Sequence, residues 1–309
     1  MQYRRLGKAG IKVSAISLGA WLTYGGTVEG QQAGACVREA LEAGINHFDT
    51  ADAYQGGQAD EALRRALEGV PRHSYVLATK VFWPIGPGPN DRGTSRKHLH
   101  ESLEASLRRL GTDYVDILYC HRFDEETDPE ETMFALNDLV ERGKVLYAGV
   151  SEWPAHRIRE ARGIQRRLGL RGLAASQPVY NLLNRGIERE VLPVCRDEGI
   201  GLIVFSPLAQ GLLSGKYRSG EAVPEGTRGS RSQGIVRAEN LARVDRLRPI
   251  ADQAGIPLTH LALAWILRLP EVSAALVGAT RPEQVRENAA AAGVKLSPDV
   301  LAAIEEALR

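Results

Sequence analysis

The feature that most constrains this chain is a repeated alternation of short apolar runs with longer helical patterns along its 309 residues. Most of the runs are nearly continuous in Val, Ile, Leu and Ala, which is typical of strands buried on both faces of a parallel sheet. Eight runs are found, at residues 14–19, around His47 and Phe48, and at 75–80, 114–121, 145–151, 174–180, 201–206 and 274–278. Eight parallel strands joined by helices close naturally into a barrel.

The segments between these runs carry helical periodicity. In residues 95–110, for example, leucines recur at spacings of three and four residues, which gives a helix one apolar face. Other helices are expected at residues 31–43, 57–67, 129–142, 154–168, 187–198, 241–254, 258–269, 282–291 and from 298. We therefore predict an α/β fold, a (β/α)8 TIM barrel that spans residues 1–309 as a single domain, with a short β-hairpin at its N-terminus over residues 3–13.

Composition narrows the classes of function. The 39 basic and 38 acidic residues give a net charge of +1, so the chain has no overall field that would attract nucleic acid or an anionic membrane. Its three cysteines, Cys36, Cys120 and Cys195, follow no pairing pattern, which favours a reducing compartment. The first residues lack an apolar signal core, and no apolar segment is long enough to cross a bilayer. We expect a soluble, cytoplasmic protein.

Four polar residues stand at the ends of successive predicted strands. Asp49 and, five residues later, Tyr54 follow the second run, Lys80 ends the third, and His121 ends the fourth. Catalysis in such barrels takes place at the carboxyl ends of the strands, so we expect these side chains to converge. A nearby ammonium group would lower the pKa of a tyrosine, about 10 when unperturbed, toward the working range. A carboxylate would hold the lysine charged, and a neutral histidine would orient a carbonyl group.

Such a set suits protonation of a carbonyl oxygen while another group supplies hydride. Each residue taken alone has an ordinary structural interpretation, as a turn former, a packing side chain, a solvated charge or a loop histidine. It is the combination on four strand ends that favours chemistry.

The residues also indicate where a cofactor would bind. No Gly-x-Gly-x-x-Gly pattern follows the first run, which argues against a Rossmann domain. Instead, Gly278 leaves the last predicted strand and residues 278–284 open a helix, with Thr280 as the predicted N-cap and Glu283 completing a capping box. Loops after the seventh and eighth strands of such barrels commonly bind phosphate at a helix N-terminus. No metal ion is expected.

From about residue 3 to residue 288 the sequence resembles an aldo-keto reductase, and it matches that family's catalytic tetrad at Asp49, Tyr54, Lys80 and His121. Residues 80–83, 92–98, 206–209 and 212–217 are similar to the branch that contains the β subunits of voltage-gated potassium channels and their bacterial relatives. The channel subunits that the chain resembles look to have an asparagine at the position of His121. The histidine in this chain therefore favours reductase activity. The resemblance implies NADPH-dependent reduction of an aldehyde or ketone to an alcohol, with Tyr54 as general acid.

The resemblance also implies cofactor contacts. Ser151 and Gln177 would hold the nicotinamide carboxamide, and Phe205 would stack on the nicotinamide ring. At this stacking position the channel subunits look to have a tryptophan instead of phenylalanine. Lys216 and Arg228 would bind phosphate charge, which fits NADPH better than NADH. The loop after Lys216 is slightly longer, so Arg231 is an alternative to Arg228. The full set expected to bind NADPH is Trp21, Ser151, Gln177, Phe205, Ser206, Leu208, Gly211, Lys216, Arg228, Gly278, Thr280, Gln284, Glu287 and Asn288.

Two further functions stay open. The channel-like stretches are compatible with an NADPH-binding, redox-sensing regulatory subunit with little turnover. The same barrel could carry sugar-phosphate isomerisation, which needs no nicotinamide. The expected partner is a small carbonyl substrate, with neither nucleic acid nor membrane, and the channel-like relatives suggest homo-oligomeric assembly.

Overall fold

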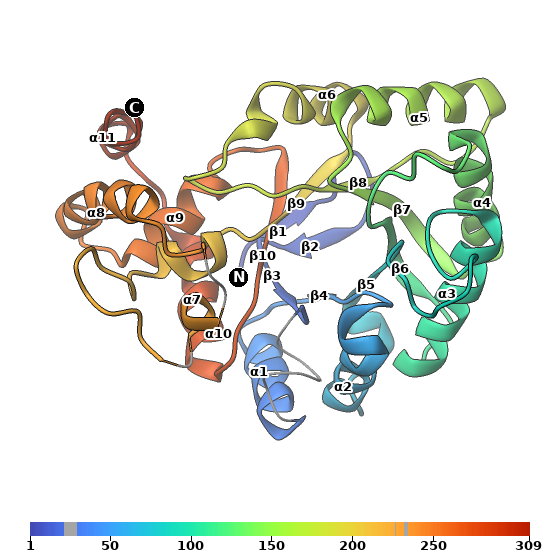
Figure 1. The fold of residues 1–309 in the computed structure, drawn as a ribbon, viewed down its shortest axis with the longest axis horizontal. Helices are drawn as coiled ribbons and strands as arrows, with labels where there is room; N and C mark the ends of the chain where they lie inside the picture. Colours follow the sequence, from blue (N-terminus) through green and yellow to red (C-terminus); the bar gives the residue numbers. More distant parts are fainter. Residues whose placement is uncertain (22–29, 226, 232–233) are drawn as a thin grey trace.

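Eight parallel strands close into a barrel in the order β10-β3-β4-β5-β6-β7-β8-β9 (Figure 1). The computed structural model describes residues 1–21, 30–225, 227–231 and 234–309. The strands are β3 (Ile16–Gly19), β4 (His47–Asp49), β5 (Val76–Val81), β6 (Val115–Cys120), β7 (Val145–Ser151), β8 (Ala175–Gln177), β9 (Gly201–Phe205) and β10 (Val272–Val277). This topology confirms the predicted (β/α)8 TIM barrel.

Helices connect these strands around the outside of the barrel (Figure 1). They are α1 (Gly30–Glu42), α2 (Gln58–Ala66), α3 (Arg96–Leu110), α4 (Pro129–Glu141), α5 (Ala155–Leu168), α6 (Val191–Glu198), α7 (Arg228–Arg231), α8 (Ala238–Gln253), α9 (Leu258–Leu267), α10 (Pro282–Ala290) and α11 (Pro298–Ala307). Short 3-10 helices are η1 (Tyr54–Gly57), η2 (Arg72–Ser74), η3 (Gly186–Glu188), η4 (Ala209–Ser214) and η5 (Ala291–Gly293). Neither α7 nor η4 was expected from the sequence, because both lie in irregular loops whose apolar residues do not recur at helical spacing.

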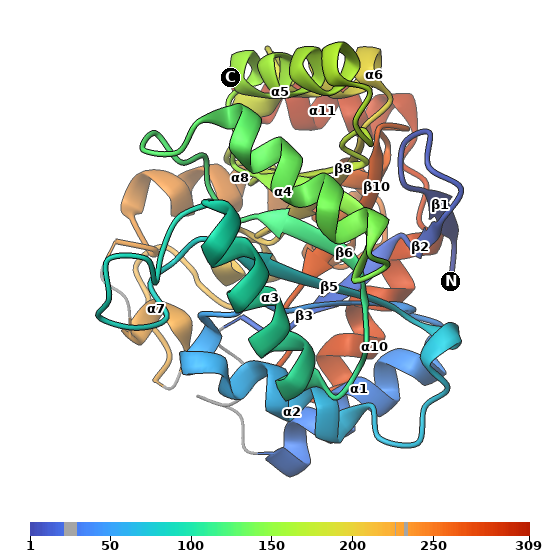
Figure 2. The same ribbon diagram turned by 90° about the vertical axis from the view of Figure 1, so that its right-hand side faces the viewer.

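A two-stranded hairpin closes the amino ends of the strands, as predicted. Its strands β1 (Tyr3–Arg5) and β2 (Lys12–Ser14) pair antiparallel. Leu6 and Val13 are fully buried in the apolar cluster that fills the barrel. The backbone N–H of Lys8 donates to the carbonyl of Gly199, ahead of β9, at 2.8 Å. Figure 2 shows the hairpin at the right-hand edge of the molecule and α7 at the opposite side. The hairpin therefore does not cover the carboxyl ends of the strands, where such barrels carry their active sites.

The packing inside the barrel sets the register of the rim. Ala78, Tyr119, Ala175 and Ile203 belong to the buried cluster that fills the interior. Side chains two residues apart on a strand point to the same face. The next inward positions, toward the carboxyl ends, are therefore Lys80, His121, Gln177 and Phe205. The strand register that places the packing residues inside the barrel therefore also places these four side chains at its mouth.

One helix pair contains a membrane-length apolar window. Over the described ranges, no single helix is long and apolar enough to cross a bilayer, and only α8 with α9 reaches the required length, across a bend of 92°.

Gly149 on β7 gives a test of the interior packing. A Cβ atom at this position would lie 2.7 Å from Cδ1 and Cε1 of the buried Tyr119 ring. Because overpacking of a filled core is destabilising, Gly149→Ala should lower the free energy of unfolding by about 1–3 kcal/mol. Urea denaturation measures the change. Gly163→Ala is the control, since Gly163 lies on α5 with no atom within 4 Å of an added Cβ, and helix propensity there favours alanine. Equal stability of both variants would contradict this packing.

Candidate active site

The four candidate catalytic residues lie at the carboxyl ends of three neighbouring strands. Asp49 is the last residue of β4, and Tyr54 begins η1 in the loop that follows. Lys80 is the penultimate residue of β5, and His121 directly follows β6. Because β4, β5 and β6 pair in parallel, these ends share one rim.

Asp49 and Lys80 form an ion pair in the mouth of the barrel. Their side chains are only 2% and 1% exposed. Lys80 Nζ also donates to the carbonyl of Thr50 at 3.0 Å, and Gln177 Nε2 donates to the second oxygen of Asp49 at 2.9 Å. Burial alone would lower the pKa of Lys80, but the charge of Asp49 and the proximity of Tyr54 outweigh it, so the pKa is raised. Lys80 therefore stays charged at neutral pH, as the sequence analysis expected.

Tyr54 lies against this pair, with Lys80 Nζ 5.0 Å from the centre of its ring. Its ring meets that of His121 edge-on at 5.7 Å between centroids. Burial raises the pKa of Tyr54 above its usual value, and the charge of Lys80 opposes this shift without overcoming it. The expectation that Lys80 brings the tyrosine pKa down toward neutrality is therefore wrong. The sequence did not reveal that this phenol is partly buried against the core.

His121 is neutral. Burial and, after it, the charges of Lys80 and Arg122 lower its pKa to about 2. Its Nδ1 is buried with no hydrogen-bond partner among the described residues. Trp83 also meets the imidazole edge-on, with ring centroids 6.1 Å apart. An uncharged imidazole beside a protonated phenol can hold a carbonyl oxygen by hydrogen bonds.

A buried polar network that the sequence analysis missed holds the loop that carries Tyr54. Asp52 accepts hydrogen bonds from the N–H of Ala53 and the hydroxyl of Ser102 on α3, each at 2.6 Å. Burial raises the pKa of Asp52 to about 7. This carboxyl, two residues before Tyr54, ties the loop to α3.

A second buried carboxyl secures the other end of that loop. Asp60 on α2 accepts from the hydroxyl of Thr50 at 2.8 Å and from the guanidinium of Arg109 on α3 at 2.9 Å. A signal for this network was available, because Ser102, Ser106 and Arg109 follow helical spacing beside the leucine stripe of α3.

The residues expected at the nicotinamide end lie together on β7, β8 and β9. Ser151 and Gln177 are paired in register, and the Ser151 hydroxyl donates to the carbonyl of Gln177 at 2.9 Å. Phe205 ends β9 and is partly exposed. Glu152 has a positive φ of 56°, and its side chain accepts from the N–H of Val179 at 2.7 Å.

The segment after β9 turns tightly. Ser206, Ala209 and Gln210 have positive φ values of 50°, 47° and 57°, and Gly211 has 100°. Leu208 lies between them as the N-cap of η4. The φ of Gly211 favours glycine, and a Cβ atom there would lie 2.9 Å from Lys216 Nζ, so this amine lies close over the turn.

Two expected phosphate ligands come from the loop that contains α7. Arg228 is partly buried, and its guanidinium lies 5.3 Å from the ring of Trp21 at the end of β3. The expected Trp21 and Arg228 are thus brought together, whereas Lys216 lies nearer Gly211. The side chain of the alternative ligand, Arg231, lies outside the described residues.

The loop after β10 differs from the prediction. Arg281, not Thr280, is the N-cap of α10, and no side-chain cap is formed, so the predicted capping box with Glu283 is wrong. Pro282 fixes the first helical residue, which leaves Thr280 too far from the first turn to cap it. The N–H and hydroxyl of Thr280 instead donate to Gln284 Oε1 at 2.8 and 3.1 Å. Asn288 is buried, while Gly278 and Glu287 are exposed.

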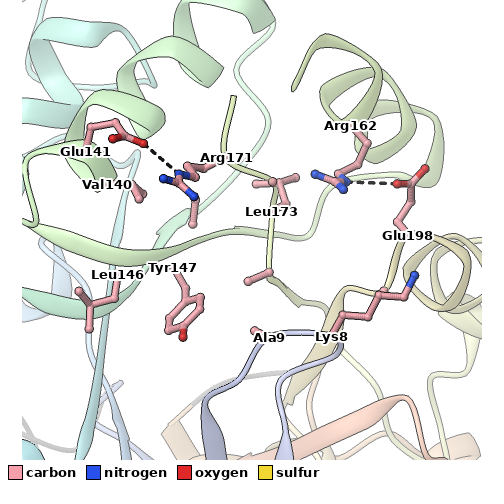
Figure 3. A pocket seen from close by; sticks show the side chains of 14 residues that line it. Lys8, Ala9, Val140, Glu141, Leu146, Tyr147, Arg162, Arg171, Leu173 and Glu198 are labelled. Atoms are coloured by element: carbon pink, nitrogen blue, oxygen red, sulfur yellow. Dashed lines mark hydrogen bonds and ion pairs between the residues drawn. The ribbon is translucent and has the colours of Figure 1, made fainter. Parts of the chain in front are cut away.

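Two cavities lie away from these residues. One of about 540 Å³ is lined by the hairpin, α4, β7 and α5 at the amino ends of the strands (Figure 3). Its arginines are already paired, Arg171 with Glu141 and Arg162 with Glu198. Because these two arginines are paired and the candidate catalytic groups lie at the opposite rim, we assign the site to the rim.

Comparison with known proteins bears on this arrangement. The family model for the aldo/keto reductase family matches residues 15–309. The chain is 44% identical over 324 residues to a probable voltage-gated potassium channel subunit beta of Arabidopsis thaliana, which covers 100% of the chain and 97% of that protein. It is 39% identical over 302 residues to L-glyceraldehyde 3-phosphate reductase of Escherichia coli strain K12, which covers 93% of the chain and 86% of the relative.

Asp52 predicts a pH dependence of stability. Its pKa of about 7 in the fold lies above the value of an exposed aspartate, about 3.9, so ionisation destabilises the fold as the pH rises through this interval. Asp52→Asn stays neutral and keeps an acceptor for the N–H of Ala53. The difference in free energy of unfolding, variant minus unaltered protein, should therefore become more positive between about pH 5 and about pH 8. Urea unfolding at both pH values, with the exposed Asp113→Asn as control, measures the difference, and parallel pH profiles would contradict it.

Proposed function

Because the chain belongs to the aldo/keto reductase family, we propose that this oxidoreductase uses NADPH to reduce an aldehyde or ketone to an alcohol, with Tyr54 as the general acid. The contact that carries the proposal is the charged Lys80 amine, 5.0 Å from the Tyr54 ring and paired with the buried Asp49. General acids of this kind must be protonated at the working pH.

The raised pKa of Tyr54 is compatible with this role. The phenol stays protonated throughout the neutral range. A carbonyl oxygen that gains negative charge becomes alkoxide-like and is a far stronger base than a phenolate, so transfer of the proton from Tyr54 is downhill. Lys80 then stabilises the phenolate that is left, and neutral His121 holds the oxygen in line with the hydroxyl.

The cofactor residues support a nicotinamide dinucleotide. Lys216 and Arg228 form no ion pair within the described part of the chain, and the Lys216 amine lies over the turn at Gly211. Free cations beside a turn without a Cβ suit phosphate oxygens. With its Nε2 engaged by Asp49, Gln177 has its Oε1 left to accept from a carboxamide. Bound NADPH would supply the hydride.

The names of the relatives bear on the alternatives. Those named as channel subunits support a second candidate, a regulatory protein that binds NADPH with little turnover. The relative named as a reductase supports turnover of a small aldehyde, and the retained His121 favours it. Sugar-phosphate isomerisation has no such support, because the family model is that of an oxidoreductase family.

The proposal predicts that Tyr54→Phe lowers kcat about 10²- to 10⁴-fold, since the general acid is lost, while NADPH binding is nearly unchanged. NADPH absorbance with a panel of aldehydes measures turnover, and a fluorescence titration measures binding. Tyr75→Phe, near the amino end of β5, is the control and should keep full turnover. Undiminished turnover by Tyr54→Phe would remove the proposed acid, and tight NADPH binding with no turnover by the parent would favour the regulatory candidate.

A second prediction concerns phosphate recognition. Charge-assisted hydrogen bonds contribute roughly 1.5–3 kcal/mol, so Arg228→Gln should weaken NADPH binding about tenfold or more and NADH binding less. Fluorescence titration of both nucleotides measures this difference. Arg237→Gln, an exposed position in the same loop, should change neither affinity, and an equal loss in the two variants would speak against the assignment.

A further inference from the structure

Arg122 carries a charge at the mouth that none of the roles above uses. It directly follows His121, and its guanidinium lies 5.4 Å from the centre of the Trp83 ring. One of its nitrogens, Nη1, donates to the backbone carbonyl of His121 at 2.6 Å. The side chain is partly buried, and Trp83 beneath it is 41% exposed. The cation is therefore held by a ring and a carbonyl at the entrance to the catalytic groups.

Among the described residues, no carboxylate pairs with this cation. Within residues 1–21, 30–225, 227–231 and 234–309, Arg122 makes no ion pair. Nearby charges at the catalytic groups cancel, because Asp49 is paired with Lys80 and His121 is neutral. The charge that remains around the Tyr54 hydroxyl is that of Arg122, whose field lowers the pKa of both Tyr54 and His121.

A neighbouring arginine shows what a merely structural arrangement looks like. Arg157 on α5 also stacks on a ring, that of Phe123, at 4.2 Å. Its guanidinium is neutralised by Glu125 at 2.8 Å and Glu160 at 2.9 Å. Arg122 has the same kind of aromatic support but, among the described residues, lacks the acids, so its charge is available to an anionic ligand.

We propose that Arg122 is the specificity-determining residue for the substrate, and that the substrate is a small carbonyl compound carrying an anionic group, a carboxylate or a phosphate. The proposal rests on the proposed reductase function. The carbonyl oxygen would bind between Tyr54 and His121, and the anionic group a few bonds away would meet the guanidinium above Trp83. A planar guanidinium binds either anion through two parallel hydrogen bonds, and the exposed indole gives the intervening carbons an apolar wall.

The proposal is tested with pairs of substrates that differ only in charge. Succinic semialdehyde and its methyl ester form the carboxylate arm, and glyceraldehyde 3-phosphate and glyceraldehyde form the phosphate arm. In at least one arm the unaltered enzyme should prefer the anion by about tenfold or more in kcat/KM, the preference should lie mainly in KM, and it should fall as salt is added. The arm with the larger preference identifies the anion.

The variants Arg122→Gln and Arg122→Lys locate the cause of the preference. Arg122→Gln should reduce the anion-to-neutral ratio of kcat/KM to near one, and Arg122→Lys should keep part of it because the charge remains. Arg157→Gln is the matched control and should keep the full ratio. Equal use of anionic and neutral substrates by the unaltered enzyme, or an undiminished ratio in Arg122→Gln, would overturn the proposal.

A binding measurement separates this inference from the proposed function. Succinic semialdehyde and glyceraldehyde 3-phosphate are titrated calorimetrically into protein saturated with NADP⁺, where no reduction can occur. Binding that Arg122→Gln weakens at least tenfold supports the anion site even if no carbonyl compound is turned over, in which case only the reductase function fails. Turnover of neutral aldehydes with no Arg122-dependent binding of either anion would leave the reductase function standing and refute the anion site.

Discussion

The buried ion pair between Asp49 and Lys80 is the constraint on which the rim depends. Removing two charges from water costs several kcal/mol for each ion, and only close pairing with complete hydrogen bonding offsets it. Here each charge has a second partner, Gln177 for Asp49 and the Thr50 carbonyl for Lys80. The pair therefore fixes the ends of β4, β5 and β8 relative to one another. Tyr54 packs against this ion pair. A shift of either charged residue would leave the other as a buried, unpaired charge, so the surroundings of Tyr54 are held in place.

Interior packing and chemistry are coupled through the strand register. The side chains that fill the barrel, such as Ala78 and Tyr119, lie two residues before Lys80 and His121 on the same strands. A slip of one residue would turn the whole set outward. The outer network adds a second attachment, because Asp52 and Asp60 tie the loop of Tyr54 to helices that do not touch the barrel interior. Fold stability and active-site geometry thus rest on the same contacts.

Much of this could be predicted from the sequence. Eight apolar runs and the helices between them gave the barrel, and strand-end positions brought Asp49, Lys80 and His121 to one rim. The predictions that were wrong concern properties that depend on the three-dimensional surroundings of a residue. The direction of the Tyr54 pKa shift followed from burial that periodicity does not reveal, and the cap of α10 followed from where Pro282 starts the helix. The networks of Asp52 and Asp60 were missed because the helical spacing of Ser102, Ser106 and Arg109 does not show which carboxyl groups lie opposite them.

The left-handed backbone of the rim has a consequence for engineering. Gln55, Glu152, Ser206, Ala209 and Gln210 all have positive φ without being glycine, and each such residue stores of order 1–3 kcal/mol. Selection for heat resistance would find its easiest gains at these positions, since glycine releases the strain. The same changes would loosen the mouth of the barrel, where the candidate catalytic residues lie. A thermostable descendant of this enzyme is therefore better sought by changing the outer helices than by relaxing the loops.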